Sequence, residues 1–149
     1  MNGVETMESV HYLLMKTHTN LNRWILNQAA TIGLSPGQPK VLECLTQLGE
    51  CNQKAIATYC EIEQATVGSI LSRMERDGLI CRKQRDGNRR SLYVSLTERG
   101  RERAQAMQKI FEEADAKAVQ QLTQEQQQAL EEMLQKIYQS VAPQEGEQI

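Results

Sequence analysis

The chain has 149 residues and a mass of 16.9 kDa, which suffices for one ordinary domain with a core of its own. Apolar residues make up 40% and charged residues 24%, a composition that excludes a disordered chain. No apolar run approaches the roughly 18 residues that a membrane-spanning helix needs. The N-terminal sequence has no basic segment followed by an apolar one, so we expect a cytoplasmic protein that does not bind membranes.

The charge is unevenly distributed along the chain, although the formal net charge is only −2. Residues 73–103 contain ten basic and five acidic side chains, whereas residues 1–72 contain four and six, and residues 104–149 three and eight. A basic segment of this kind can bind phosphate even when the whole chain is acidic.

Two helices are predicted before residue 50. Apolar residues recur at spacings of three and four from about residue 7 to residue 30, as in Val10, Leu14, Leu21 and Trp24. We expect the second helix to begin after an N-cap at Ser35, with Pro36 in its first position and Gln38 as the capping partner, and to end at Gly49.

A short helix, a turn and a second helix are predicted next. Asn52 is a candidate cap for a helix over residues 53–60, and the following helix runs from Gln64 to Asp77 and stops at Gly78. Two strands, over residues 79–85 and 91–97, enclose an arginine-rich turn at residues 86–90. The order is that of a helix-turn-helix followed by a wing.

The last third of the chain is predicted to form two helices, capped by Thr97 and by Thr123 with Gln126. The first and last helices carry wide apolar stripes without an obvious partner in a winged helix-turn-helix domain. We expect these stripes to form a homodimer interface; the alternative is that both helices fold back onto their own protomer.

The fold class expected is mainly α (α+β), namely a winged helix-turn-helix with a two-stranded wing, flanked by N- and C-terminal helices that form a dimerisation region. The predicted divisions are an N-terminal dimerisation helix over residues 1–33, the DNA-binding domain over 34–97, C-terminal dimerisation helices over 98–142, and a disordered tail over 143–149.

The second helix of the motif is expected to enter the major groove of DNA with its polar face. Near the start of that face, Gln64, Thr66 and Ser69 could bond base edges, and Ala65 could touch a thymine methyl group. Farther along, Ser72 shares the face, and Arg73 and Arg76 are better placed for phosphate. In the wing, the residues predicted to contact DNA are Arg85, Asn88, Arg89 and Arg90.

Three stretches together resemble the MarR family of bacterial winged-helix transcription regulators: LSPGQPKVLECL, KAIATYCEIEQATVGSILSRMERDGLICR and GNRRSLYVSLTERG. The resemblance implies a homodimer that represses transcription at a pseudo-palindromic operator in double-stranded DNA and is released by a small molecule or an oxidant. The family's wings commonly read Asp-Arg-Arg, with the aspartate holding the second arginine, where this chain has Asn88-Arg89-Arg90. The interaction that holds Arg90 is therefore weaker or is supplied by Asp86. Arg89 is the best wing-tip residue for a minor-groove contact.

The sequence offers two kinds of candidate effector site, a small-molecule pocket and reactive cysteines. An effector pocket like the family's would lie between the dimer helices and the wing domain, with Tyr12, His18, Trp24 and Phe111 as candidate walls; the alternative is that they belong to the ordinary core. Cys44 and Cys60 fall on apolar positions and are expected to be inert, whereas Cys51 and Cys81 are the candidate reactive thiols.

No sequence motif points to catalysis or to a cofactor. The chain has no phosphate-binding glycine loop, nucleophile elbow or zinc-ligand spacing, so we expect neither an enzyme nor a metal site. Two alternative functions stay open: a winged helix that binds an acidic protein, and a regulator that senses oxidants through cysteine.

Overall fold

The computed structural model describes residues 7–85 and 88–144, and within these all side chains except those of residues 85–91. The predicted disordered tail therefore lies outside the described residues from 145 onward. The elements in chain order are α1 (Val10–Thr31), α2 (Gln38–Leu48), β1 (Cys51–Asn52), α3 (Gln53–Cys60), α4 (Gln64–Arg76), β2 (Ile80–Arg85), β3 (Asn88–Leu96), α5 (Glu98–Ala118) and α6 (Gln124–Val141).

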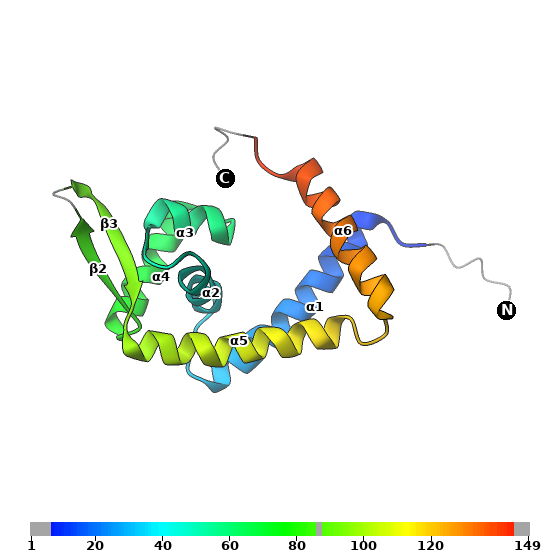
Figure 1. The fold of residues 1–149 in the computed structure, drawn as a ribbon, viewed down its shortest axis with the longest axis horizontal. Coiled ribbons are helices and arrows are strands. Elements are labelled where there is room, and N and C mark those ends of the chain that lie inside the picture. The colour runs from blue at the N-terminus through cyan, green and yellow to red at the C-terminus, as the bar shows by residue number, and fades with distance from the viewer. Residues whose placement is uncertain (1–6, 86–87, 145–149) are drawn as a thin grey trace, which may run out of the picture.

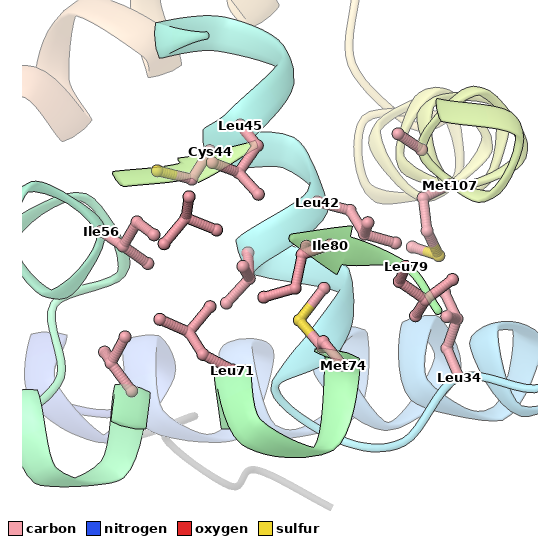
Figure 2. Close-up of a cluster of buried hydrophobic side chains, with 14 of the residues drawn as sticks. Leu34, Leu42, Cys44, Leu45, Ile56, Leu71, Met74, Leu79, Ile80 and Met107 are labelled. Carbon is pink, nitrogen blue, oxygen red and sulfur yellow. The ribbon is translucent and has the colours of Figure 1, made fainter. Parts of the chain in front are cut away.

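The long helix α5 connects two parts of the molecule (Figure 1). Helices α2, α3 and α4 and the β2–β3 hairpin gather near its N-terminal end, and α6 follows its C-terminal end. Inside the first part, apolar side chains from α2, α3, α4, the sheet and α5 form one buried cluster (Figure 2). Its fully buried members include Val41, Leu42, Ile56, Leu71 and Val94.

Most predicted helix starts are confirmed by the caps. The side chains of Asn52, Thr97 and Thr123 each accept a hydrogen bond from the backbone N–H three residues later, and Thr123 forms a full capping box with Gln126. Gly49 and Gly78 adopt the positive φ angles that the helix ends require.

The predicted start of the second helix is wrong by two residues. Gly37, at φ 92°, turns the chain, so α2 begins at Gln38 with Pro39 in its first turn, and Ser35 is not its N-cap. The expected partnership survives in part, because the buried Gln38 side chain accepts a hydrogen bond from the Ser35 N–H at 3.0 Å and donates one to Asp77 Oδ2 at 3.3 Å. Gln38 thereby joins the start of α2 to the end of α4.

The sheet has one strand more than predicted. The strand order is β1-β3-β2, all antiparallel, with Cys51 opposite Val94 in the added pair. In the wing pair, Ile80 lies opposite Leu96 and Arg82 opposite Val94, and the register shifts between Gln84 and Arg85. Two residues are too short a run to give an alternation signal, which is why β1 was missed.

The two terminal helices differ in how far they join the core. The C-terminal half of α1 packs on its own protomer, with Ala29 buried and Trp24 and Ile25 against the core. By contrast, α6 has no buried residue. Of the two terminal helices, only the C-terminal half of α1 therefore packs back onto its own protomer.

An ion pair fixes the wing to α4. The Arg82 guanidinium on β2 donates to the Glu75 carboxylate at 3.1 and 3.3 Å and to Ser72 Oγ at 3.4 Å. Hydrogen bonding to Arg82 lowers the pKa of Glu75. A bidentate pair of this geometry constrains direction as well as distance, so the base of the wing keeps one orientation relative to α4.

The start of α5 approaches the end of α4 so closely that only glycine fits at position 100. The Thr97 N–H donates to the Leu79 carbonyl at 3.1 Å, and Thr97 Oγ1 donates to the Gly78 carbonyl at 2.6 Å. A Cβ added at Gly100 would overlap the Leu79 carbonyl oxygen. The Leu79 backbone cannot move aside as a flexible side chain could.

We therefore expect Gly100→Ala to lower the free energy of unfolding by about 1–3 kcal/mol, because α5 must move away from the core. Gly68→Ala is the matched control, since an added Cβ in α4 meets only the end of the Gln53 side chain, at 3.2 Å. Alanine favours the helix over glycine by up to about 1 kcal/mol, so the Gly68→Ala variant should be at least as stable as the parent. Urea titration followed by circular dichroism measures both; equal stabilities would contradict the close approach.

We expect Glu75→Gln to lower the free energy of unfolding at pH 7 by less than about 1 kcal/mol, because the pair with Arg82 is partly exposed. The folded-state pKa of Glu75 is lowered, so this stabilisation is present above the unfolded-state value of about 4.5 and is lost as the pH falls through the folded-state value. Urea titrations of the parent, Glu75→Gln, Arg82→Gln and the double variant give the coupling energy. A coupling of zero at pH 7 would rule out a stabilising pair.

Candidate nucleic-acid interface

The polar face of α4 is exposed and does not pack against the core, as the sequence predicts. All seven of its candidate DNA-contacting side chains are exposed: Gln64, Ala65, Thr66, Ser69, Ser72, Arg73 and Arg76. On the opposite face, Val67, Leu71 and Met74 are fully buried. Since successive residues are 100° apart on a helix, burial of one stripe fixes the direction of the other.

Charge is graded along this face. The first two turns of α4 carry no charged side chain, and Arg73 and Arg76 stand in its last turn. Ser69 Oγ donates to the Ala65 carbonyl at 3.3 Å and keeps its lone pairs for a further partner. Two exposed carboxylates, Glu61 and Glu63, stand in the turn before the helix. The prediction that the arginines contact phosphate and that the neutral first turns contact base edges is compatible with this distribution of charge.

The turn between α3 and α4 is held by local contacts. Glu61 adopts a left-handed conformation at φ 57°, and the Ile62 N–H donates to the Ala57 carbonyl at 3.1 Å. Gln53 Nε2 on α3 donates to the Gln64 carbonyl at 2.9 Å. These bonds fix where α4 begins relative to α3. From α6, Tyr138 also donates to Glu61 Oε1, at 2.5 Å, and this bond raises the pKa of Tyr138.

The predicted wing contacts are described only in part. The backbone of Arg85, Asn88, Arg89 and Arg90 belongs to β2 and β3, so these residues do lie at the far end of the hairpin. Their side chains, and all of Asp86 and Gly87, lie outside the described residues. The roles of the wing arginines stay predictions.

The four residues proposed as walls of an effector pocket do not form one group. Tyr12 and His18 are exposed on α1, and Lys16 Nζ stands 5.1 Å from the Tyr12 ring centre. Trp24 and Phe111 are half-buried against the core instead. A pocket of about 450 Å³ lies elsewhere, at the end of α2 and along α3; its lining residues are Leu48, Asn52, Lys54, Ala55, Thr58 and Tyr59.

A chain of polar contacts that was not predicted from the sequence links this pocket to α5. Tyr59 donates to Glu43 Oε1 at 3.0 Å, Lys40 pairs with the same oxygen at 3.1 Å, and Lys40 Nζ stands 4.7 Å from the Phe111 ring centre. Partial burial and the bond to Glu43 raise the pKa of Tyr59 to about 12. Lys40 and Glu43 share one helix face by their spacing of three, but their partners come from α3 and α5.

Three of the four cysteines lie close together. Cys44 is buried, Cys51 and Cys60 are half-buried, and the influence of the two neighbouring thiols, together with burial, raises the pKa of Cys44. Cys81 stands apart, with its sulfur 3.1 Å from Ser95 Oγ. The three cysteines lie on three different elements, α2, β1 and α3, so sequence alone could not bring them together.

Across residues 7–85 and 88–144, none of the helices has the length and apolar character that crossing a lipid bilayer would need.

Comparison with known proteins identifies the family. The MarR family model matches residues 34–92. The homoprotocatechuate degradative operon repressor of Escherichia coli is 32% identical over 101 residues, which cover 68% of this chain and 68% of that protein. An HTH-type transcriptional repressor of Mycobacterium tuberculosis is 26% identical over 126 residues, covering 85% of this chain and 91% of the repressor.

Solved structures show the same fold. The S. aureus MepR–DNA complex superimposes with a TM-score of 0.82 at 24% identity, over 91% of this chain and all of that one. Bordetella bronchiseptica BpsR, whose DNA binding is regulated by 6-hydroxynicotinic acid, gives a TM-score of 0.80 at 24% identity, over 87% of this chain and 98% of that one. With a described helix-turn-helix and wing and a relative 32% identical over two thirds of its length, this chain belongs to the MarR family, a family of transcription regulators and not of enzymes.

Proposed function

We propose that the protein is a sequence-specific regulator, a repressor in the cytoplasm, that binds double-stranded DNA as a homodimer. The observation that carries this proposal is the exposed face of α4, which is neutral over two turns and ends in two arginines. A helix of this width fits the major groove, and the basic wing follows it directly in the chain. The repressors among the relatives support the same reading.

The dimer would bring two copies of α4 to one duplex. Apolar side chains remain exposed on the N-terminal half of α1 and along α6, among them Val10, Leu13, Met133, Ile137 and Val141. Burying such side chains is worth about 1.5–3 kcal/mol each. A two-fold axis through these helices would present two recognition helices to half-sites about one DNA turn apart, as a pseudo-palindromic operator requires.

Release by a small ligand is part of the proposal. The similarity to BpsR, whose DNA binding a small aromatic acid regulates, supports it. The residues that we predict to line the effector pocket of this chain are Tyr12, His18, Trp24 and Phe111. A dimer partner would have to enclose this pocket. The competing function, docking of an acidic protein, is distinguished by salt, because binding to duplex phosphate weakens steeply as salt rises.

We expect the protein to be a dimer with about twice the chain mass of 16.9 kDa in light scattering at micromolar concentration. Ile137→Glu should shift it to the monomer, because a charge would have to be buried in the interface. Gln135→Glu is the matched control on the far side of α6 and should stay dimeric. A monomeric parent protein, or an Ile137→Glu variant as dimeric as the control, would remove α6 from the interface.

The recognition helix can be tested with a duplex selected from a random-sequence library. We expect Gln64→Ala and Ser69→Ala each to weaken binding to the selected duplex by about 1–3 kcal/mol, because a base-edge contact is lost. Binding to a scrambled duplex and the free energy of unfolding should hardly change, since both side chains are exposed. Titrations by fluorescence anisotropy measure both duplexes; equal losses on the two would mean that these residues do not read sequence.

The wing variants give the contrasting result. We expect Arg89→Ala and Arg90→Ala to weaken binding to both duplexes alike and to reduce the salt dependence by about one unit of slope, as loss of a phosphate contact does. The same titrations, repeated at four salt concentrations, provide the slopes. A change in base preference at constant slope would instead assign the wing arginines to sequence reading.

A further inference from the structure

The first turn of α4 is held by a side chain from the helix before it. Gln53 is the first residue of α3, and its Nε2 donates to the Gln64 carbonyl at 2.9 Å. Gly68 lies one turn after Gln64 on the same flank of α4, and a Cβ added there would stand 3.2 Å from that Nε2. The missing side chain at Gly68 thus leaves the space in which the Gln53 amide lies.

The start of α4 lacks the local cap that the other long helices have. Helices α1, α3, α5 and α6 each begin after a residue whose side-chain oxygen accepts a hydrogen bond from the backbone N–H three residues later. In the described part of the chain, Glu63, the N-cap residue of α4, makes no such bond. An uncapped first turn opens more readily, so the contact from Gln53 has more influence on it.

Gln53 is itself fixed to the wing sheet. Asn52, the residue before it, pairs with Tyr93 of β3, and the Asn52 side chain caps α3 by accepting from the Ala55 N–H at 2.9 Å. The backbone that carries the Gln53 amide is therefore bound to β3 on one side and continues into α3 on the other. Figure 1 shows α3 beside α4, the helix that this amide reaches.

One flank of α4 is thereby held near both of its ends. Glu75 stands three turns after Gln64 and only roughly 20° from it about the helix axis, at 100° per residue. Its carboxylate accepts the hydrogen bonds of Arg82 from β2. The buried stripe already prevents rotation about the axis, so these two contacts restrain the tilt of α4 against the sheet. The contact from Gln53 is the one at the end that is predicted to meet base edges.

We infer that Gln53 is a positioning residue for sequence reading, because its amide holds the first turn of the recognition helix at the tilt that the wing sheet sets. The inference rests on the proposed function, in which Gln64 contacts a base edge. A hydrogen bond to a base edge weakens steeply as it departs from linearity, so a small change of tilt is enough to weaken it. Attraction to phosphate depends on charge and is much less directional.

The substitution Gln53→Met removes the donor and keeps the length and helix propensity of the side chain. We expect this variant to bind the duplex selected from a random-sequence library about fivefold more weakly, the lower end of what one base-edge contact contributes. Binding to the scrambled duplex should be unchanged, because it depends on phosphate contacts. Equal losses on the two duplexes would mean that Gln53 contacts DNA itself or supports the fold, and would overturn the inference.

The matched control is Gln124→Met. It makes the same substitution at the same helix position, the first residue of α6, at the opposite end of the molecule from α4 (Figure 1). This variant should bind both duplexes like the parent. A loss on the selected duplex equal to that of Gln53→Met would show that the position of the glutamine does not matter, against the inference.

A double-mutant cycle provides a readout that a merely structural role would not change. Because Gln53 acts through the first turn, Gln53→Met should weaken binding to the selected duplex much less in the Gln64→Ala background than in the parent. The urea midpoint of unfolding should fall by the same amount in both backgrounds. Loss of affinity by the same factor in the two backgrounds would contradict the inference.

A measurement without DNA separates this inference from the proposed function. The Gly68 N–H donates to the Gln64 carbonyl in the helical pattern, so its hydrogen exchange, followed by NMR, reports opening of the first turn. We expect this amide to exchange about threefold faster in Gln53→Met, as loss of one net hydrogen bond implies, with the last turn of α4 unchanged. Equal exchange in variant and parent overturns the inference. If the parent prefers no duplex, the proposed function fails, while the exchange rates still decide whether Gln53 holds the first turn.

Discussion

The burial of one apolar stripe of α4 is the constraint on which the rest of the structure depends. Val67, Leu71 and Met74 are fully enclosed by α2, α3 and the sheet, so the helix cannot rotate about its axis without exposing them. The face that is left outward is then the polar one, from Gln64 to Arg76. The other contacts near α4 set its position, because the buried stripe already determines its rotation. These contacts are the caps, the Gln38 hydrogen bonds and the Arg82–Glu75 pair.

The sequence predicted the elements that have their own local signals. Asn52, Thr97 and Thr123 are caps because a short oxygen-bearing side chain there meets free backbone N–H groups, and this needs no knowledge of the rest of the fold. The exposed face of α4 followed from helical periodicity alone. The second helix failed because Ser35 and Pro36 also form a reasonable cap and first position, and only the backbone of Gly37 decides against them.

Features made by contacts between elements could not be predicted in the same way. The β1 strand exists because β3 passes beside it, and Gln38 is buried because Asp77, at the end of another helix, receives its amide. In the candidate site, periodicity predicted which side chains of one helix face are exposed, whereas the effector walls, taken from two helices far apart in the sequence, remain a prediction.

The single helix α5 also makes the protein a mechanical lever. It runs without interruption from the base of the wing, where Gly100 abuts Leu79, to the loop before α6, and its 21 residues span about 30 Å. A rigid rod of this length converts a tilt of about 5° at one end into a displacement of about 2.5 Å at the other. A tilt of α5 imposed by the terminal helices would therefore displace its other end by a distance comparable to the length of a hydrogen bond.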